Sequence, residues 1–376
     1  MKTAFIYSDD FAKFKYSDTH PLKPFRLKLT YELIKSYCLH ELKNSLIVSP
    51  GYADERDVLK VHTHDYIDVL KTLNSGIDVP YANRFGLGYG DNPIFNGMFD
   101  WSMLVTGATM EATSLVLDGK VDIAFNISGG LHHALPNKAS GFCYINDIAV
   151  AIQYLIERGK RVAYIDIDAH HGDGVQHIFY DTNRVLKISI HETGYYLFPG
   201  TGFVDEMGEK DGYGYTVNVP LPPYSDDDVF HHVFDKVVLE CIDRFKPDIL
   251  VAQLGVDTLY DDPLAHLNYS ISGFADAVKK IVNLGIPLIA LGGGGYDIAS
   301  VAKAWTVAWA IMNNIKIDSK IPAEYLKSYA SYGFEDDNIF GKKYSLLDEQ
   351  KENLLEVVNK EIEIIHKKIV PLIKDR

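Results

Sequence analysis

The hydrophobic positions of the chain fall into two kinds of segment that alternate along the sequence. Short apolar runs rich in β-branched and aromatic residues predict buried strands. These runs lie at residues 1–8, 121–127, 161–168, 185–191, 215–221, 247–254 and 286–291. Segments with helical spacing end near residue 37 and cover 53–60, 64–73, 98–118, 146–158, 226–245 and 272–284. Strands that alternate with helices indicate an α/β fold with a largely parallel sheet covered on both faces.

Unusual polar residues follow directly after four of these strands. They are His132-His133, residues 166–173, Asp257, and a run of glycines that ends at Tyr296. The carboxyl ends of parallel strands lie at one edge of a sheet, where ligands bind in open α/β folds. We therefore expect one site in one domain over residues 1–315, with residues 316–376 forming a helical extension packed on it.

The densest of these clusters reads Asp-Ile-Asp-Ala-His-His-Gly-Asp over residues 166–173. A buried carboxylate is unfavourable without a partner, and a metal ion or an imidazole would supply one. Asp168 and His170 lie two residues apart and can offer one oxygen and one nitrogen to a transition metal. The alternative is a strand end with capping acids and a hydrogen-bonded histidine. The density of ligands favours the metal.

The other clusters have simpler explanations when each is taken alone. His132-His133 could be a polar turn, and Asp257 could cap a helix. The glycine run at 292–295 could hold a phosphate, but no dinucleotide-binding or P-loop motif includes it. No G-x-S-x-G motif indicates a serine hydrolase.

Composition excludes several classes of protein. The net charge of −14 argues against direct binding of nucleic acid, which requires a basic surface. No apolar run reaches the length of a membrane span, and no signal peptide begins the sequence. Cys38, Cys143 and Cys241 are isolated, so neither a disulfide framework nor a cysteine zinc site is indicated. We expect a cytoplasmic protein without a membrane partner.

Several long motifs in order give the chain a resemblance to a known family. They are residues 20–26 (HPLKPFR), 129–134 (GGLHHA), 140–147 (SGFCYIND), 164–174, 198–202 (FPGTG), 253–257 (QLGVD) and 292–296 (GGGGY). Over roughly residues 17–310 the chain resembles the zinc-dependent histone deacetylases, specifically class I-like members and their prokaryotic acetoin-utilization-protein relatives. The resemblance implies the arginase–deacetylase fold, a single domain with a central eight-stranded parallel sheet flanked by helices.

The resemblance implies a metal centre with catalytic side chains around it. Asp168, His170 and Asp257 match the metal ligands, with Zn²⁺ as the family metal and Fe²⁺ as an alternative. Tandem histidines, their carboxylate partners and a tyrosine match the catalytic residues: His132 with Asp166, His133 with Asp173, and Tyr296. His133 is expected to be the general base and then the acid, His132 an electrostatic partner, and Tyr296 the donor to the oxyanion.

Further positions match substrate and cation sites of the family. The predicted walls of an acyl-lysine tunnel are Gly141, Phe142, Phe198 and Leu264. Asp91 resembles the rim acid that holds the substrate backbone, and Arg26 the arginine of an acetate channel. Structural K⁺ is expected at two sets of residues. The first set is Asp166, Asp168, His170 and Ser189, and the second is Phe179, Thr182, Val185 and Tyr215.

These matches predict a metal-dependent amidohydrolase that removes acetyl groups from the ε-amino group of lysine in a peptide or protein. Three rivals remain open. Asp168-Ala169-His170 also echoes a binuclear manganese ureohydrolase. A deacetylase of small amines such as acetylpolyamines is a second rival, although polyamine-type members carry a glutamate where Leu264 stands. The third is an acyl-lysine binder without turnover. The sequence leaves the oligomeric state open.

Overall fold

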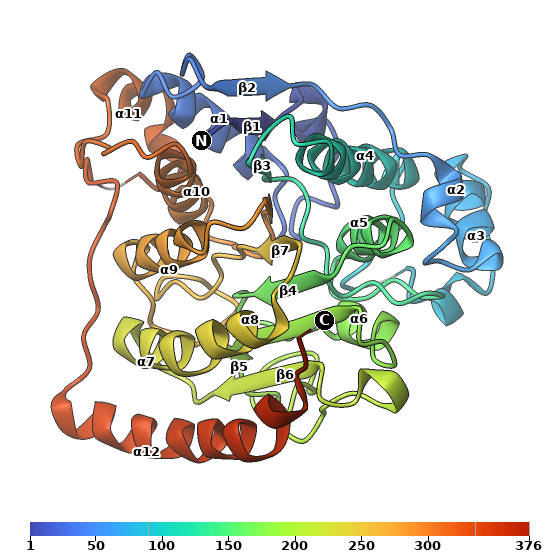
Figure 1. Cartoon of the computed structure of the whole chain (residues 1–376). Helices are drawn as coiled ribbons and strands as arrows, with labels where there is room; N and C mark the ends of the chain where they lie inside the picture. Colours follow the sequence, from blue (N-terminus) through green and yellow to red (C-terminus); the bar gives the residue numbers. More distant parts are fainter. Residues whose placement is uncertain (89, 335, 376) are drawn as a thin grey trace.

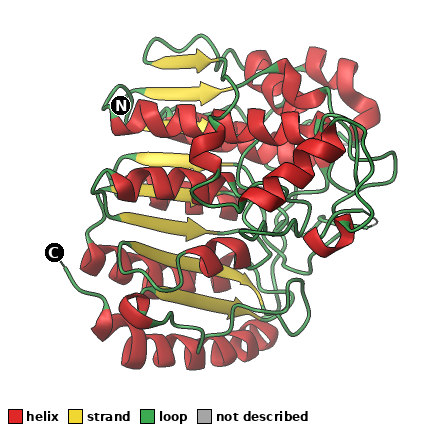
Figure 2. Cartoon of the chain, turned by 90° about the vertical axis from the view of Figure 1, so that its right-hand side faces the viewer, coloured by secondary structure: helices red, strands yellow, loops and turns green. Residues whose placement is uncertain are grey.

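The computed structural model describes residues 1–88, 90–334 and 336–375. Its centre is a parallel sheet of eight strands in the order β2-β1-β3-β8-β7-β4-β5-β6 (Figures 1 and 2). The strands are β1 (Thr3–Ile6), β2 (Ser45–Val48), β3 (Ile123–Asn126), β4 (Val162–Asp166), β5 (Val185–Glu192), β6 (Thr216–Leu221), β7 (Ile249–Gln253) and β8 (Leu288–Leu291). The predicted eight-stranded parallel sheet of the arginase–deacetylase fold is confirmed.

Two layers of helices cover the sheet (Figure 1). One layer contains α1 (Phe25–Ser36), α7 (Asp227–Val233), α8 (Leu239–Phe245), α9 (Ile271–Asn283), α10 (Ile298–Met312) and α12 (Asp348–Ile364). The other contains α2 (Glu55–Val58), α3 (His64–Asn74), α4 (Met98–Leu117), α5 (Asp147–Glu157) and α6 (Asp173–Ile178). A further short helix, α11 (Ala323–Tyr329), lies against α1. None of the described helices combines the length and apolar character that a bilayer crossing requires.

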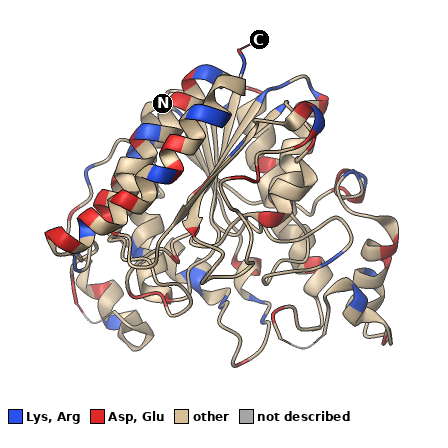
Figure 3. Cartoon of the chain, turned by 90° about the horizontal axis from the view of Figure 1, so that it is seen from below, with Lys and Arg blue, Asp and Glu red and all other residues tan. Residues whose placement is uncertain are grey.

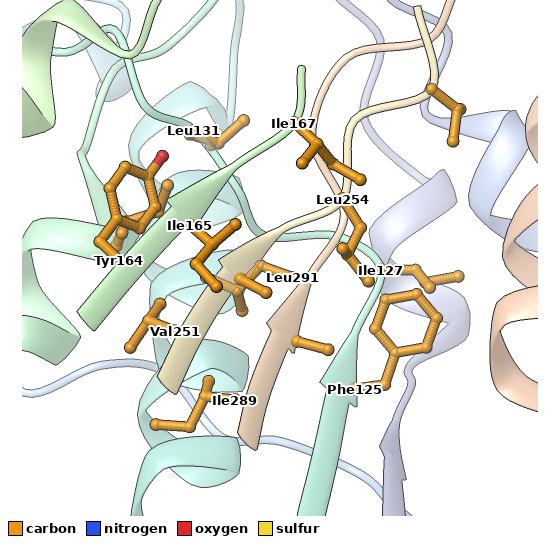
Figure 4. Packing of buried hydrophobic residues seen from close by; sticks show 14 of the residues in the cluster. Phe125, Ile127, Leu131, Tyr164, Ile165, Ile167, Val251, Leu254, Ile289 and Leu291 are labelled. Atoms are coloured by element: carbon orange, nitrogen blue, oxygen red, sulfur yellow. The ribbon is translucent and has the colours of Figure 1, made fainter. Parts of the chain in front are cut away.

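The strands in the middle of the sheet are buried on both faces, which explains their continuous apolar sequences. Phe125 of β3 and Ile165 of β4 point to one face of the sheet, and Val251 of β7 and Ile289 of β8 point to the other, and all four are buried (Figure 4). Burial of each such side chain contributes about 1.5–3 kcal/mol relative to an exposed position. This core holds the carboxyl ends of β3, β4, β7 and β8 in fixed register, and the polar clusters follow from those ends.

Some elements differ from the predictions. β2, α6 and α10 were not predicted: β2 is a short, half-exposed edge strand, and α10 is apolar on nearly every side. The strand predicted through residue 168 ends at Asp166. A π-helical turn at Phe234–Val238 separates α7 from α8 within the single helix predicted for 226–245.

The C-terminal segment returns to the sheet after α11. Its long helix α12 lies against α7 and β6, and a π-helical turn follows at Ile365–Ile369. Acidic and basic side chains mix on the outer helices of the molecule (Figure 3), as is usual for solvated surfaces. The helical extension therefore contacts the sheet, and the boundary at residue 315 stays a prediction.

Candidate active site

The four polar clusters meet at one edge of the sheet. They follow β3, β8, β7 and β4, which are consecutive neighbours in the sheet order. Because all four strands are parallel, their carboxyl ends present the following loops on the same side. The convergence expected from the sequence is therefore present.

Asp168, His170 and Asp257 form a buried group whose ligand atoms lie within 4.8 Å of one another. The Nδ1 atom of His170 lies 3.1 Å from Oδ1 of Asp168 and 2.9 Å from Oδ2 of Asp257. Two carboxylates and one imidazole are a suitable donor set for Zn²⁺ or Fe²⁺, and three protein ligands leave coordination positions open. The residues therefore fit a catalytic metal.

The remaining oxygen of each carboxylate is held by N–H donors. Oδ2 of Asp168 accepts from Nε2 of Gln253 at 2.6 Å and from the backbone N–H of Gly294 at 2.8 Å. Oδ1 of Asp257 accepts from the backbone N–H of Ala169 at 2.8 Å. These contacts fix both carboxylates with their other oxygens toward His170. In metal sites, hydrogen-bonding groups outside the ligands orient the ligands in the same way.

The glycine run lets the backbone pass directly beside this group. A Cβ atom on Gly294 would lie 2.0 Å from Oδ2 of Asp257, and one on Gly255 would lie 2.1 Å from Oδ2 of Asp168. Any side chain at either position would displace a carboxylate. Glycine at these positions therefore allows the backbone to lie directly against the carboxylates of the Asp-His-Asp group.

The tandem histidines each pair with a carboxylate. Nδ1 of His132 lies 2.8 Å from Oδ2 of Asp166, and Nδ1 of His133 lies 2.7 Å from Oδ1 of Asp173. The two Nε2 atoms are 3.0 Å apart. An anion on Nδ1 keeps the proton there, so in a neutral ring Nε2 is free to accept a proton.

The surroundings of the two imidazoles shift their pKa values in opposite directions. Burial opposes protonation of His132, but the carboxylates of Asp166 and Asp168 outweigh it and raise its pKa to about 9. Burial and the neighbouring charge of His132 lower the pKa of His133 to about 4, despite its hydrogen bond to Asp173. A charged His132 beside a neutral His133 is the arrangement that an electrostatic partner and a general base require.

The ring of Tyr296 lies against the ring of Phe142 and near that of His170. The ring centroids of Tyr296 and Phe142 are 5.7 Å apart with nearly perpendicular planes, and the centroid of His170 is 6.5 Å from that of Tyr296. Burial and the nearby carboxylate of Asp257 raise the pKa of Tyr296 well above its usual value. The phenol therefore keeps its proton and can donate a hydrogen bond.

Asp262 is a site residue that the sequence analysis missed. One carboxylate oxygen accepts from the backbone N–H of Tyr296 at 2.7 Å, and the other from the backbone N–H of Leu264 at 2.9 Å. This buried side chain therefore ties a predicted tunnel wall to the tyrosine. The acidic pair Asp261-Asp262 just after the predicted ligand Asp257 was the available signal.

Phe142 and Phe198, two of the predicted tunnel walls, lie close to the tandem histidines. The ring of Phe198 is 5.1 Å from that of His133, and Phe198 is 43% exposed. Phe142 has φ +69°, a left-handed conformation that is strained for an aromatic residue. A Cβ on its neighbour Gly141 would lie 2.4 Å from the His133 ring. The backbone conformation at Gly141 and Phe142 brings Gly141 against His133 and Phe142 against Tyr296. Leu264, another predicted tunnel wall, is half-buried.

Several of these residues line a small cavity. Its volume is about 20 Å³, room for roughly one water molecule. Leu22, Leu131, Gly293 and Tyr296 are among its lining residues. Arg26 is not: its buried guanidinium donates to the carbonyl oxygens of Gly293 and Gly295, each at 2.6 Å. The acetate-channel role of Arg26 stays a prediction.

Asp91 lies exposed outside this group. Its carbonyl oxygen is 3.1 Å from Nε2 of His20, so the rim loop is tied to the HPLKPFR motif. Its contact with a substrate backbone stays a prediction.

The predicted cation sets lie around β5. In the first set, Ser189 is directly opposite Asp166 in the pairing of β5 with β4. In the second set, the carbonyl oxygen of Phe179 already accepts a hydrogen bond from Nζ of Lys187. The sequence analysis did not consider Lys187.

Known proteins are similar to this chain over most of its length. The sequence model of the histone deacetylase domain matches residues 20–312. The acetoin utilization protein AcuC of Bacillus subtilis is 41% identical over 86% of this chain and 85% of its own. Histone deacetylase B of Dictyostelium discoideum is 39% identical over 88% of this chain and 78% of its own.

A solved structure is similar as well. The crystal structure of an HDAC homolog from Aquifex aeolicus superimposes with a TM-score of 0.86 at 34% identity, covering 95% of this chain and 100% of that one. An HDAC homolog complexed with SAHA gives the same values. The chain belongs to the histone deacetylase family of hydrolases.

Proposed function

We propose that the protein hydrolyses the amide of N6-acetyl-lysine in peptides or proteins, with Zn²⁺ or Fe²⁺ on Asp168, His170 and Asp257. One observation carries the proposal: an open Asp-His-Asp group lies beside a neutral histidine and a protonated tyrosine, behind an aromatic entrance. Metal, base and oxyanion donor are the parts that amide hydrolysis by water requires.

The bound metal would lower the pKa of a water molecule and polarise the substrate carbonyl. Nε2 of His133 accepts a proton from the water molecule that attacks the carbonyl carbon. The same proton then passes to the leaving nitrogen as the C–N bond breaks, which yields acetic acid and the free lysine amine. Asp173 holds the Nδ1 proton of His133 throughout, and the charge of His132 stabilises the negative charge that develops.

Tyr296→Phe should lower kcat roughly 10²-fold or more with a smaller change in KM. The substitution removes the hydroxyl that donates to the developing oxyanion and keeps the ring against Phe142. The measurement pairs steady-state kinetics with metal analysis and peptide binding by calorimetry. Metal and peptide should stay bound. A near-normal kcat would remove Tyr296 from the mechanism, and loss of metal would make its role structural.

Three features favour acyl-lysine over the rival substrates. The rings of Phe142 and Phe198 suit a methylene stem that is apolar up to its amide. Leu264 offers no charge for the second ammonium group of a polyamine. Among the described residues, one Asp-His-Asp group has ligand atoms close enough for a metal, whereas a binuclear ureohydrolase needs ligands for two ions. Relatives at 38–41% identity are called histone deacetylases and acetoin utilization proteins.

The substrate class is tested by turnover of an acetyl-lysine peptide and of N-acetylputrescine by the same preparation. We expect a higher kcat/KM for the peptide. Leu264→Glu should raise the relative kcat/KM for N-acetylputrescine by up to roughly fivefold, since a partly exposed ion pair contributes about 0.2–1 kcal/mol. Leu264→Gln, of equal length and no charge, is the control. Preference of the unaltered protein for N-acetylputrescine would make it a deacetylase of small amines, and binding of the peptide without turnover would make it an acyl-lysine binder.

A further inference from the structure

Lys187 is a cationic side chain enclosed within the protein. It lies in β5 between Leu186 and Ile188 and is 3% exposed. Its Nζ atom donates a hydrogen bond to the carbonyl oxygen of Phe179 at 2.5 Å. Within the described parts of the chain, no carboxylate reaches ion-pair distance of this amine. A buried ammonium without an anion is unfavourable unless polar groups replace its water.

Two residues of the second predicted potassium set, Phe179 and Tyr215, accept hydrogen bonds from Lys187 through their carbonyl oxygens. Phe179 follows the last residue of α6, where carbonyl oxygens lack partners within the helix and attract cations. Val185 precedes Lys187 by two residues on β5, so the two side chains point to the same face of the sheet. The carbonyl oxygen of Tyr215 accepts from the backbone N–H of Lys187 at 3.0 Å. Thr182 lies in the turn between Phe179 and β5.

We infer that the amine of Lys187 occupies the place of the second monovalent cation, so that this chain carries a covalently attached amine there and binds no K⁺ at Phe179. A potassium ion and an ammonium group both bind carbonyl oxygens, which carry a partial negative charge. The Phe179 oxygen accepts a hydrogen bond from Nζ, and an ion in the position of Nζ would collide with the amine.

The inference holds for either protonation state of the side chain. Burial lowers the pKa of Lys187 to about 7. A neutral amine still donates a hydrogen bond to Phe179 and still fills the space, and the charged form adds repulsion of like charges. The conformation of the segment between α6 and β5 should then not depend on the potassium concentration.

Thallous ion is a suitable probe, because its anomalous scattering locates it in a crystal. Crystals of the unaltered protein soaked in Tl⁺ should show no ion on the Phe179 carbonyl. Lys187→Thr shortens the side chain with a residue that suits strands, and should gain one Tl⁺ at that position. Lys187→Met fills the space with an uncharged chain of similar length and should gain none.

Thermal unfolding provides a second readout that does not depend on activity. Each protein is melted in KCl and in tetramethylammonium chloride at equal ionic strength. The rise in Tm on going to KCl should be larger for Lys187→Thr than for the unaltered protein or Lys187→Met, because an ion that binds only the folded state stabilises it.

Two results would overturn the inference. One is Tl⁺ bound to the Phe179 carbonyl of the unaltered protein, a measurement that stands even if Lys187→Thr does not fold. The other is a folded Lys187→Thr that gains neither Tl⁺ nor a larger potassium effect than Lys187→Met. Lys187 would then be a packing residue beside carbonyls that form no cation site.

Discussion

Asp257→Ala should lose the bound metal and turnover together. Two ligands, Asp168 and His170, would remain of the three. Loss of an outer hydrogen-bonding partner already weakens metal binding or activity about 10–100-fold, and loss of a ligand should exceed that. Metal content per chain and kcat/KM on an acetyl-lysine peptide are measured on the same preparation.

Two variants separate the metal from general effects on folding. Asp257→Asn keeps the shape of the side chain and an acceptor for the backbone N–H of Ala169, but removes the charge. It should fold as the unaltered protein does and still bind metal weakly. Tyr296→Phe should lose turnover while it keeps the metal. An Asp257→Ala protein without metal but with normal turnover would contradict the proposed mechanism.

His133→Ala should lower kcat by about 10²–10⁴-fold, the usual contribution of general acid–base catalysis. Its effect on KM should be smaller, because the imidazole acts on the water and the leaving group. Burial and the charge of His132 keep the pKa of His133 below its ordinary value. The acid limb of the kcat/KM profile of the unaltered protein should therefore lie below pH 6.5, and turnover should be lost only as the pH falls through that limb.

His132→Ala is the matched comparison, since the two rings are neighbours and each pairs with an aspartate. It removes a charge and leaves the base, so it should retain more activity than His133→Ala. If His133→Ala were near normal and His132→Ala inactive, the two roles would be reversed.

Features that depend on local sequence were predictable. Apolar runs such as residues 247–254 predict strands, because a strand that is buried on both faces contains mostly apolar residues. The positions of His132, Asp168 and Asp257 after such runs place them at one edge of the sheet without knowledge of the strand order. The resemblance then assigned these residues roles, which the geometry supports and the experiments above test.

Features that depend on contacts between distant segments were not predictable. Gln253 holds Asp168 across the pairing of β7 with β4, and Asp262 holds Tyr296 across 34 residues. α10 gave no clear signal because most of its residues are buried, so it lacks a polar face. The contact of Lys187 with Phe179 was not predictable for the same reason. The resemblance predicts a second potassium ion at Phe179, where this chain places an amine.

The most direct test of the central claim is a metal titration of protein freed of metal by a chelator, with hydrolysis of an acetyl-lysine peptide as the readout. Zn²⁺ or Fe²⁺ should restore activity in proportion to the ion added, up to one ion per chain, and no further. Full turnover by the metal-free protein, or none at any metal content, would contradict a metal-dependent lysine deacetylase built on Asp168, His170 and Asp257.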